Sequence, residues 1–157
     1  MTDLWNIFKS DHNRLFGLDE LIGNLILETD MDMIKFLIAV PDKSQLTDFI
    51  EFLKKNSDVE LIFAETGEIA LTKISDMPVD IVIADETLGD MTGLEFAAKL
   101  VSVNPMVNCA VVSPLSKDEF HEASEGLGLV QLPKNPGEKQ AADLIQHIKT
   151  IKNLTTS

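Results

Sequence analysis

The feature that most constrains the fold is a series of five short apolar runs, separated by stretches that have helical periodicity. The runs are nearly continuous in apolar residues, which is typical of strands covered on both faces. They span residues 36–40, 61–64, 81–84, 109–112 and 129–132. Strands that alternate with helices predict an α/β fold built on a parallel sheet.

The stretches between these runs place apolar residues at positions i, i+3, i+4 and i+7, the spacing of one helix face. The clearest examples are Leu46, Phe49, Ile50 and Leu53; Leu94, Ala97, Ala98 and Val101; and Ala141, Leu144, Ile145 and Ile148. Shorter helices are predicted over 68–74 and 117–123. Right-handed crossovers then give an open, doubly wound sheet of five strands over residues 34–157, with any site at the carboxyl ends of the strands.

Residues 1–33 precede this alternation and are predicted to form a helical N-terminal extension. Apolar residues with helix spacing support this prediction, namely Leu18, Leu21, Ile22 and Leu25, after a shorter apolar turn of Leu4, Trp5 and Phe8. Two interpretations stay open for this apolar surface. It packs against the flank of its own domain, or it forms a contact with another protein, including a homodimer contact.

Charge and cysteine content exclude several classes of function. Thirteen Lys and Arg stand against 26 Asp and Glu, so the net charge of −13 repels nucleic acid and anionic membranes. The single cysteine, Cys109, excludes an internal disulfide and a multi-cysteine metal site, and fits a cytoplasmic location. No segment approaches the roughly 18 apolar residues of a membrane span. His12, His121 and His147 lie far apart and are expected at the surface.

Three polar residues follow three of the predicted strands. Asp85 comes directly after the third run, Ser113 ends the fourth, and Lys134 follows the fifth. At one edge of a parallel sheet, such a carboxylate can attack phosphorus, while the ammonium offsets charge on the transferring oxygens and the hydroxyl donates a hydrogen bond. A group of this kind suits an acceptor of a phosphoryl group.

Residues 34–152 resemble the receiver domain of bacterial two-component response regulators. The resemblance is strongest over 79–85, VDIVIAD, and 88–94, LGDMTGL, and extends to 64–71, AETGEIAL. It implies a flavodoxin-like sheet with strand order 2-1-3-4-5, and Asp85 as phosphoacceptor and metal ligand. It further implies that Ser113, Lys134 and Thr87 bind the phosphoryl group.

The largest departure from this family lies at the end of the first strand. The family has two adjacent acidic residues there that hold Mg²⁺, whereas this chain has Val40 and Pro41. Mg²⁺ needs oxygen ligands, so we expect weak or absent binding of the metal. Asp42 is favoured as a helix N-cap, with a metal-ligand role as the alternative. Glu86, which follows Asp85, is interpreted as a solvated charge.

Further departures concern the transmission of a signal. Gln131 occupies the switch position, three residues before the lysine, where the family has an aromatic side chain. Asn135 follows Lys134 where proline is common, which puts the loop geometry there in doubt. Gly89 replaces a common proline, which is expected to loosen the loop after Asp85.

These observations predict a stand-alone, atypical receiver, a pseudo-receiver that is not an enzyme and acts in phosphorelay signalling by binding proteins. The partner is a histidine kinase or a downstream signalling protein, and by resemblance it binds residues 115–125 and 138–149. In this interpretation Asp85 remains only as an ion pair with Lys134.

Two alternatives stay open. One is a phosphorylation-competent receiver that accepts a phosphoryl group from a histidine kinase on Asp85, with Asp42 or Glu86 replacing the missing acids. The other is a sensor of a small ligand that uses the vacated, more apolar pocket beside Val40.

Overall fold

The structure is a computed structural model that describes residues 33–156, with side chains as far as Asn153. The chain divides into two units between residues 33 and 34, and the description below concerns the second. The predicted helical extension over 1–33 lies outside the described residues, apart from Met33, and it stays a prediction.

The second unit contains a five-stranded parallel sheet with the order β2-β1-β3-β4-β5. Its strands are β1 (Ile34–Ala39), β2 (Val59–Ala64), β3 (Ile81–Ala84), β4 (Asn108–Val112) and β5 (Val130–Leu132). All five predicted strands are present, and the predicted doubly wound order 2-1-3-4-5 is confirmed.

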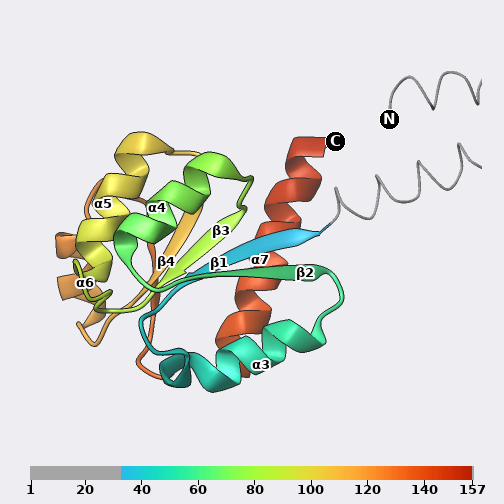
Figure 1. The fold of residues 1–157 in the computed structure, drawn as a ribbon, viewed down its shortest axis with the longest axis horizontal. Coiled ribbons are helices and arrows are strands. Elements are labelled where there is room, and N and C mark those ends of the chain that lie inside the picture. Colours follow the sequence, from blue (N-terminus) through green and yellow to red (C-terminus); the bar gives the residue numbers. More distant parts are fainter. Residues whose placement is uncertain (1–32, 157) are drawn as a thin grey trace, which may run out of the picture. The chain divides into compact units, whose positions relative to one another are not determined.

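Helices cover both faces of the sheet (Figure 1). The helical elements are η1 (Lys43–Leu46), α3 (Thr47–Lys55), α4 (Gly67–Asp76), α5 (Gly93–Val103), α6 (Lys117–Ala123) and α7 (Glu138–Thr156). Helices α3 and α7 lie on one face, and α4, α5 and α6 lie on the other. The helix predicted from Leu46 begins one turn earlier, as the short 3-10 segment η1, and continues as α3.

The strands contribute alternate side chains to two separate cores. Phe36 and Ile38 of β1 are fully buried against the α3 and α7 side. Leu37 and Ala39 of the same strand are fully buried against the α4, α5 and α6 side. The nearly continuous apolar runs therefore reflect a sheet that is buried on both faces, as the sequence predicts.

Small hydroxyl side chains fix where three of the helices start. Thr66, Thr92 and Ser116 accept hydrogen bonds from the N–H groups of Ile69, Glu95 and Glu119, respectively. Each bond satisfies a backbone donor that has no partner inside the helix. The loops at the carboxyl edge of the sheet therefore end at defined residues.

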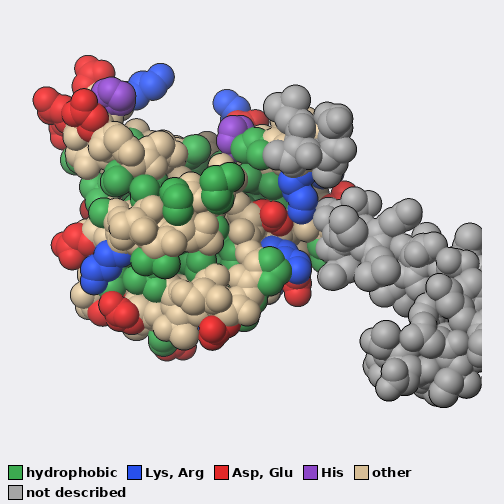
Figure 2. Space-filling view, turned by 90° about the horizontal axis from the view of Figure 1, so that it is seen from above, with side chains coloured by type: hydrophobic (Ala, Val, Ile, Leu, Met, Phe, Trp, Pro, Cys, Tyr) green, Lys and Arg blue, Asp and Glu red, His purple; other side chains and the backbone are tan. Residues whose placement is uncertain are grey.

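One face of the molecule carries many hydrophobic side chains, with acidic side chains toward its periphery (Figure 2). Among the described residues, Val103 and Met106 are 64% and 86% exposed. No helix in this part of the chain is long and apolar enough to cross a membrane.

Candidate functional site at the carboxyl edge of the sheet

Asp85 is held at the edge of the sheet by its own backbone. It follows the fully buried Ala84, and its N–H donates to the carbonyl of Ala39 in β1 at 3.0 Å. The next residue, Glu86, accepts a 2.9 Å hydrogen bond from the N–H of Gly93 at the start of α5. These two bonds place Asp85 between the end of β1 and the start of α5.

The Asp85 carboxyl group is half-buried, and this burial raises its pKa above the ordinary value of 3.8. The N–H of Glu86 donates to Oδ1 of Asp85 at 2.8 Å, and this hydrogen bond lowers the Asp85 pKa. The charges of Glu86 and Asp42 raise it, and the charge of Lys134 lowers it. Because desolvation is the largest of these effects, the protonated form is favoured relative to a free aspartate.

Ser113 is buried at the end of β4, as the sequence predicts. Its N–H donates to the carbonyl of Leu132 at 3.0 Å, and its Oγ accepts from the N–H of Leu115 at 3.2 Å. Ser113 and the exposed Thr87 line one hollow of about 260 Å³. The structure therefore brings these two predicted hydroxyl residues to one place.

Lys134 lies just after β5, but its nearest carboxylate is not the one that the sequence analysis expected. Its Nζ lies 3.9 Å from Oε2 of Glu86, and no ion pair between Lys134 and Asp85 is present. The expected Asp85–Lys134 ion pair is therefore wrong, whereas the partly exposed Glu86 side chain agrees with its interpretation as a solvated charge. The physical reason is access: Glu86 and Lys134 carry long, partly exposed side chains that meet in solvent, whereas the shorter Asp85 is half-buried.

Gln131 at the predicted switch position forms a contact that the sequence analysis missed. Its side-chain Nε2 donates to the carbonyl of Leu115 at 2.7 Å and lies 3.4 Å from the carbonyl of Ser113. Gln131, Ser113 and Lys134 line a second hollow of about 390 Å³. The amide thus fastens β5 to the loop that joins β4 to α6.

The end of β1 carries no carboxylate that points to Asp85. Val40 is 2% exposed, and its N–H donates to the carbonyl of Ala64 at 3.0 Å, while Pro41 is exposed. Asp42 caps η1: its Oδ1 accepts from the N–H of Ser44 at 3.0 Å, which lowers the Asp42 pKa. The predicted N-cap role of Asp42 is therefore confirmed.

The His, Cys, Asp and Glu side chains are the candidate metal ligands of the described residues. No group of three or more His, Cys, Asp or Glu side chains in this part of the chain is arranged to hold a metal. Mg²⁺ prefers octahedral coordination by oxygen, and Asp85 with Val40 and Pro41 beside it does not offer that donor set. His121 and His147 are exposed, and Cys109 is buried, which raises the pKa of its thiol to about 12.

The loop between β3 and α5 is tied down at several points. Thr87 pairs with Thr92 across the loop, and the N–H of Leu88 donates to the carbonyl of Met91 at 2.8 Å. Gly89 has a φ of +84°, a conformation that proline cannot adopt. Glycine at this position therefore fits a turn that is closed by hydrogen bonds.

Asp90 is a structural residue of this loop that the sequence analysis did not single out. Its two carboxylate oxygens accept from the N–H groups of Gly67 and Glu68 at 2.8 and 3.0 Å. These bonds, the first of them most strongly, lower the Asp90 pKa. A carboxylate far away in the sequence thus caps the N-terminus of α4, and no local sequence signal indicates such a contact.

The loop after Lys134 also differs from the family pattern. Asn135 adopts a left-handed φ of +54°, and the described residues contain no cis peptide bond. Asparagine tolerates this conformation better than most residues, so the turn before the buried Pro136 is formed without a glycine.

Comparisons with known proteins agree with the fold and the sequence motifs. No protein-family model matches the chain. The chemotaxis protein CheY of Listeria monocytogenes is 33% identical over 86 residues, which cover 54% of this chain and 71% of that protein. The corresponding protein of Listeria innocua matches with the same identity and coverage.

Solved structures show the same architecture at lower sequence identity. The chemotaxis response regulator CheY4 of Vibrio cholerae superposes with a TM-score of 0.64 at 21% identity, covering 74% of this chain and 98% of that one. A CheY-like receiver domain protein of Methanospirillum hungatei gives a TM-score of 0.67 at 20% identity, with coverages of 77% and 98%. The strand order, the motif around Asp85 and the CheY relatives together show that the chain belongs to the CheY-like receiver family of two-component response regulators.

Proposed function

We propose that this protein is an atypical receiver that signals by binding another protein and has weak or absent Mg²⁺-dependent phosphorylation. The observation that carries the proposal is the end of β1, where the buried Val40 and the exposed Pro41 stand beside Asp85. Phosphoryl transfer to a carboxylate depends on a metal to offset charge on the transferring oxygens. Without ligands for that metal, the Asp85 carboxylate lacks its main electrostatic support.

The contact made by Gln131 supports the same proposal. A receiver that responds to phosphorylation needs a loop after β4 with two accessible arrangements. Here the Gln131 amide holds that loop through the carbonyl of Leu115, at 2.7 Å. We infer that this hydrogen bond favours a single arrangement, so the binding surface is present without phosphorylation.

The proposed binding surface comprises α6, β5 and α7. Helix α6 exposes Asp118, Glu119 and Glu122, and α7 exposes Asp143 and Gln146. The exposed side chains of α6 include more acids than bases, so a partner with a basic patch is the best match for this part of the surface. A histidine kinase or a downstream signalling protein is the class of partner that the family implies.

The alternative function is phosphoryl acceptance by Asp85. The observation in its favour is that Asp85, Ser113 and Lys134 all follow strands at one edge of the sheet. In that case another acid, Asp42 or Glu86, completes the metal site.

A titration followed by backbone amide NMR tests the two functions against each other. Mg²⁺ is added alone, and then together with beryllofluoride, which mimics a phosphoryl group on Asp85. The expected result is no saturable shift at Asp85, Ser113 and Lys134 in the millimolar range. Saturable shifts there, absent in Asp85→Asn, would overturn the proposal and establish a phosphoacceptor.

Binding to a candidate kinase is then compared between the wild-type chain and Asp85→Asn. A phosphorylation-independent module binds equally in both forms. A charge reversal on the proposed surface, Glu119→Lys with Glu122→Lys, is expected to weaken binding. The single reversal Glu51→Lys on α3, which lies on the opposite face of the sheet from α6, is expected to leave binding unchanged.

A further inference from the structure

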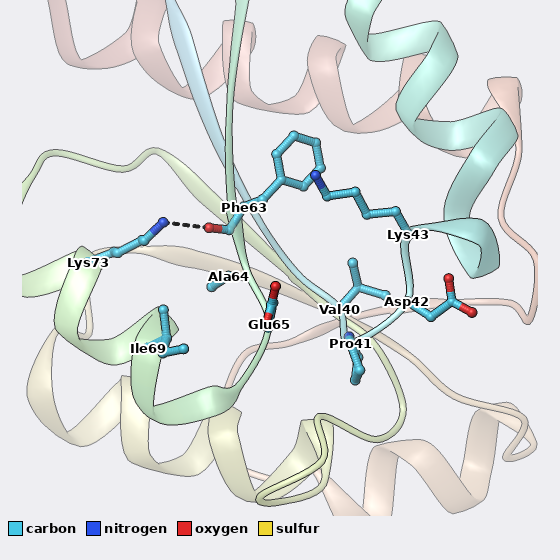
Figure 3. A pocket seen from close by; sticks show the side chains of 9 residues that line it. All are labelled: Val40, Pro41, Asp42, Lys43, Phe63, Ala64, Glu65, Ile69 and Lys73. Atoms are coloured by element: carbon cyan, nitrogen blue, oxygen red, sulfur yellow. Dashed lines mark hydrogen bonds between the residues drawn. The ribbon is translucent and has the colours of Figure 1, made fainter.

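A third hollow at the carboxyl edge lies between the ends of β1 and β2 (Figure 3). It has a volume of about 610 Å³, within the usual range for small-molecule sites. The chain leaves β1 toward α3 on one face of the sheet and leaves β2 toward α4 on the other.

The walls of this hollow combine apolar and charged side chains. The Phe63 ring is half-buried, Ile69 of α4 is 42% exposed, and Pro41 is exposed beside the buried Val40. Ile69 lies in the first turn of α4, and the part of its side chain that is exposed to water is apolar surface that a ligand can cover. The hollow therefore offers a surface on which a flat ring can pack.

Two lysines approach Phe63 from different elements (Figure 3). Lys73 of α4 donates from Nζ to the Phe63 carbonyl at 2.7 Å, and Lys43 places Nζ 3.9 Å from the centre of the Phe63 ring. The Lys73 bond uses one of three ammonium donors. Among the described residues, neither lysine has a carboxylate at ion-pair distance, although acids outnumber bases two to one in this chain.

Two carboxylates lie near these lysines and limit the charge of the ligand. Asp42 is engaged with Ser44, and its carboxylate points away from the other side chains of the hollow (Figure 3). Glu65 is exposed at the rim. The two ammonium groups and the two carboxylates sum to no net charge, and with the Asp42 carboxylate pointing away one positive charge is left toward the ligand. This suits a monoanion better than a phosphate dianion.

We propose that this hollow binds a small aromatic monocarboxylate, with its ring against Phe63 and Ile69 and its carboxylate on Nζ of Lys73. The expected pocket beside Val40 therefore lies toward β2, and two lysines make it less apolar than the sequence analysis expected. Asp85, Ser113 and Lys134 do not line it. The proposal does not require that Asp85 accepts a phosphoryl group.

Benzoate is the probe that tests this proposal, by backbone amide NMR on the full chain. We expect saturable shifts at residues 40–43, 63–65 and 69–73 in the millimolar range. Benzyl alcohol has the same ring without the charge, and inorganic phosphate has charge without the ring. Neither is expected to saturate the site.

Lysine variants show whether the contact is the one proposed. Lys73→Met and, separately, Lys43→Met are expected to weaken benzoate binding about tenfold or more. Lys43 makes no hydrogen bond to the backbone, so its variant keeps the test informative if Lys73→Met unfolds. Lys55→Met on α3 removes the same charge outside the hollow and is expected to leave the affinity unchanged, as is Asp85→Asn.

Three results would overturn the proposal. These are no saturable shift with benzoate, a response to benzyl alcohol or phosphate equal to that of benzoate, or an equal loss in Lys55→Met and the two pocket variants. Since the Asp85→Asn variant separates the two sites, failure here leaves the proposed function standing, and the reverse also holds.

Discussion

The two halves of the carboxyl edge contrast in what they carry. On the β3, β4 and β5 side, Asp85 and Ser113 directly follow β3 and β4, and Lys134 lies two residues after β5. On the β1 and β2 side, Val40 and Pro41 follow β1, and the neighbouring hollow is lined by apolar side chains, two lysines and two carboxylates. Both halves rest on the same continuous register of backbone hydrogen bonds, since Asp85 bonds to Ala39 and Val40 bonds to Ala64.

This contrast separates the scaffold from its chemistry. The ladder of a parallel sheet fixes where the residue after each strand stands, and it does so for valine as well as for aspartate. The receiver fold therefore accommodates an apolar residue after β1 as well as an aspartate after β3. The four changes below test whether the two halves are as independent as this comparison states.

Restoring the missing acids has the largest expected effect. In Val40→Asp with Pro41→Asp, an apolar residue that is 2% exposed becomes a carboxylate beside Asp85, so the free energy of unfolding without metal falls by on the order of 3 kcal/mol. Mg²⁺ is expected to recover much of this loss, because the two new acids and Asp85 can share the ion. Chemical denaturation with and without Mg²⁺ measures both effects.

The control for this experiment removes Asp85 in the same background. With Asp85→Asn added, the stabilisation by Mg²⁺ is expected to shrink. If Mg²⁺ did not change the free energy of unfolding of the variant with the two added acids, something other than the end of β1 would prevent metal binding. That result would contradict the contrast drawn between the two halves of the edge.

Asp90 joins the two halves, because it reaches from the loop after β3 to the start of α4. In Asp90→Ala the N–H groups of Gly67 and Glu68 lose their acceptor, so the melting temperature at pH 7 is expected to drop. The Asp90 pKa is lowered by folding, so its stabilisation is complete above 3.8 and is lost as the pH falls through the folded value.

Thermal unfolding between pH 7 and pH 2 checks this expectation, since the curves of the wild-type chain and of Asp90→Ala should converge on the acid side. Asp76→Ala, at the exposed C-terminal end of α4, is the matched control. A constant gap at all pH values would mean that the carboxylate charge is not responsible.

Removing the Gln131 amide sharpens the comparison within the Asp85 half. Gln131→Leu loses the hydrogen bond to the Leu115 carbonyl and is expected to cost about 1 kcal/mol of unfolding free energy. Amide exchange in residues 113–116 should also become faster. Gln146→Leu, at an exposed position of α7, is the control. Equal effects of the two variants would show that the hydrogen bond from Gln131 to the Leu115 carbonyl does not hold the loop.

Asp85→Asn has the smallest expected effect and the opposite sign. Folding raises the pKa of the half-buried Asp85, so the ionised form at pH 7 opposes folding, and the amide should stabilise the protein. The gain is less than about 1 kcal/mol because solvent screens a partly exposed group. It should fade as the pH falls through the folded pKa toward 3.8, and a loss of stability at pH 7 would contradict the pKa direction.

The sequence was sufficient for the strands, for most helices and for the residues at the strand ends. Apolar runs and i, i+3, i+4 spacing report burial, and burial decides those elements, so Asp85 and Ser113 stand where they were predicted. The Lys134–Glu86 pair, the Gln131–Leu115 bond and the Asp90 cap were not predictable. Each of them depends on the rotamer of one side chain and on elements brought together by tertiary packing, which no local pattern encodes.

The Asp90 cap gives the molecule a reporter of motion. The amide protons of Gly67 and Glu68 are bonded to a residue 23 and 22 positions away, so they are protected only while the loop after β3 is closed. Their rates of exchange with deuterated water therefore measure how often that loop opens. A signal that arrives at Asp85 and loosens the loop would be visible first at the start of a neighbouring helix.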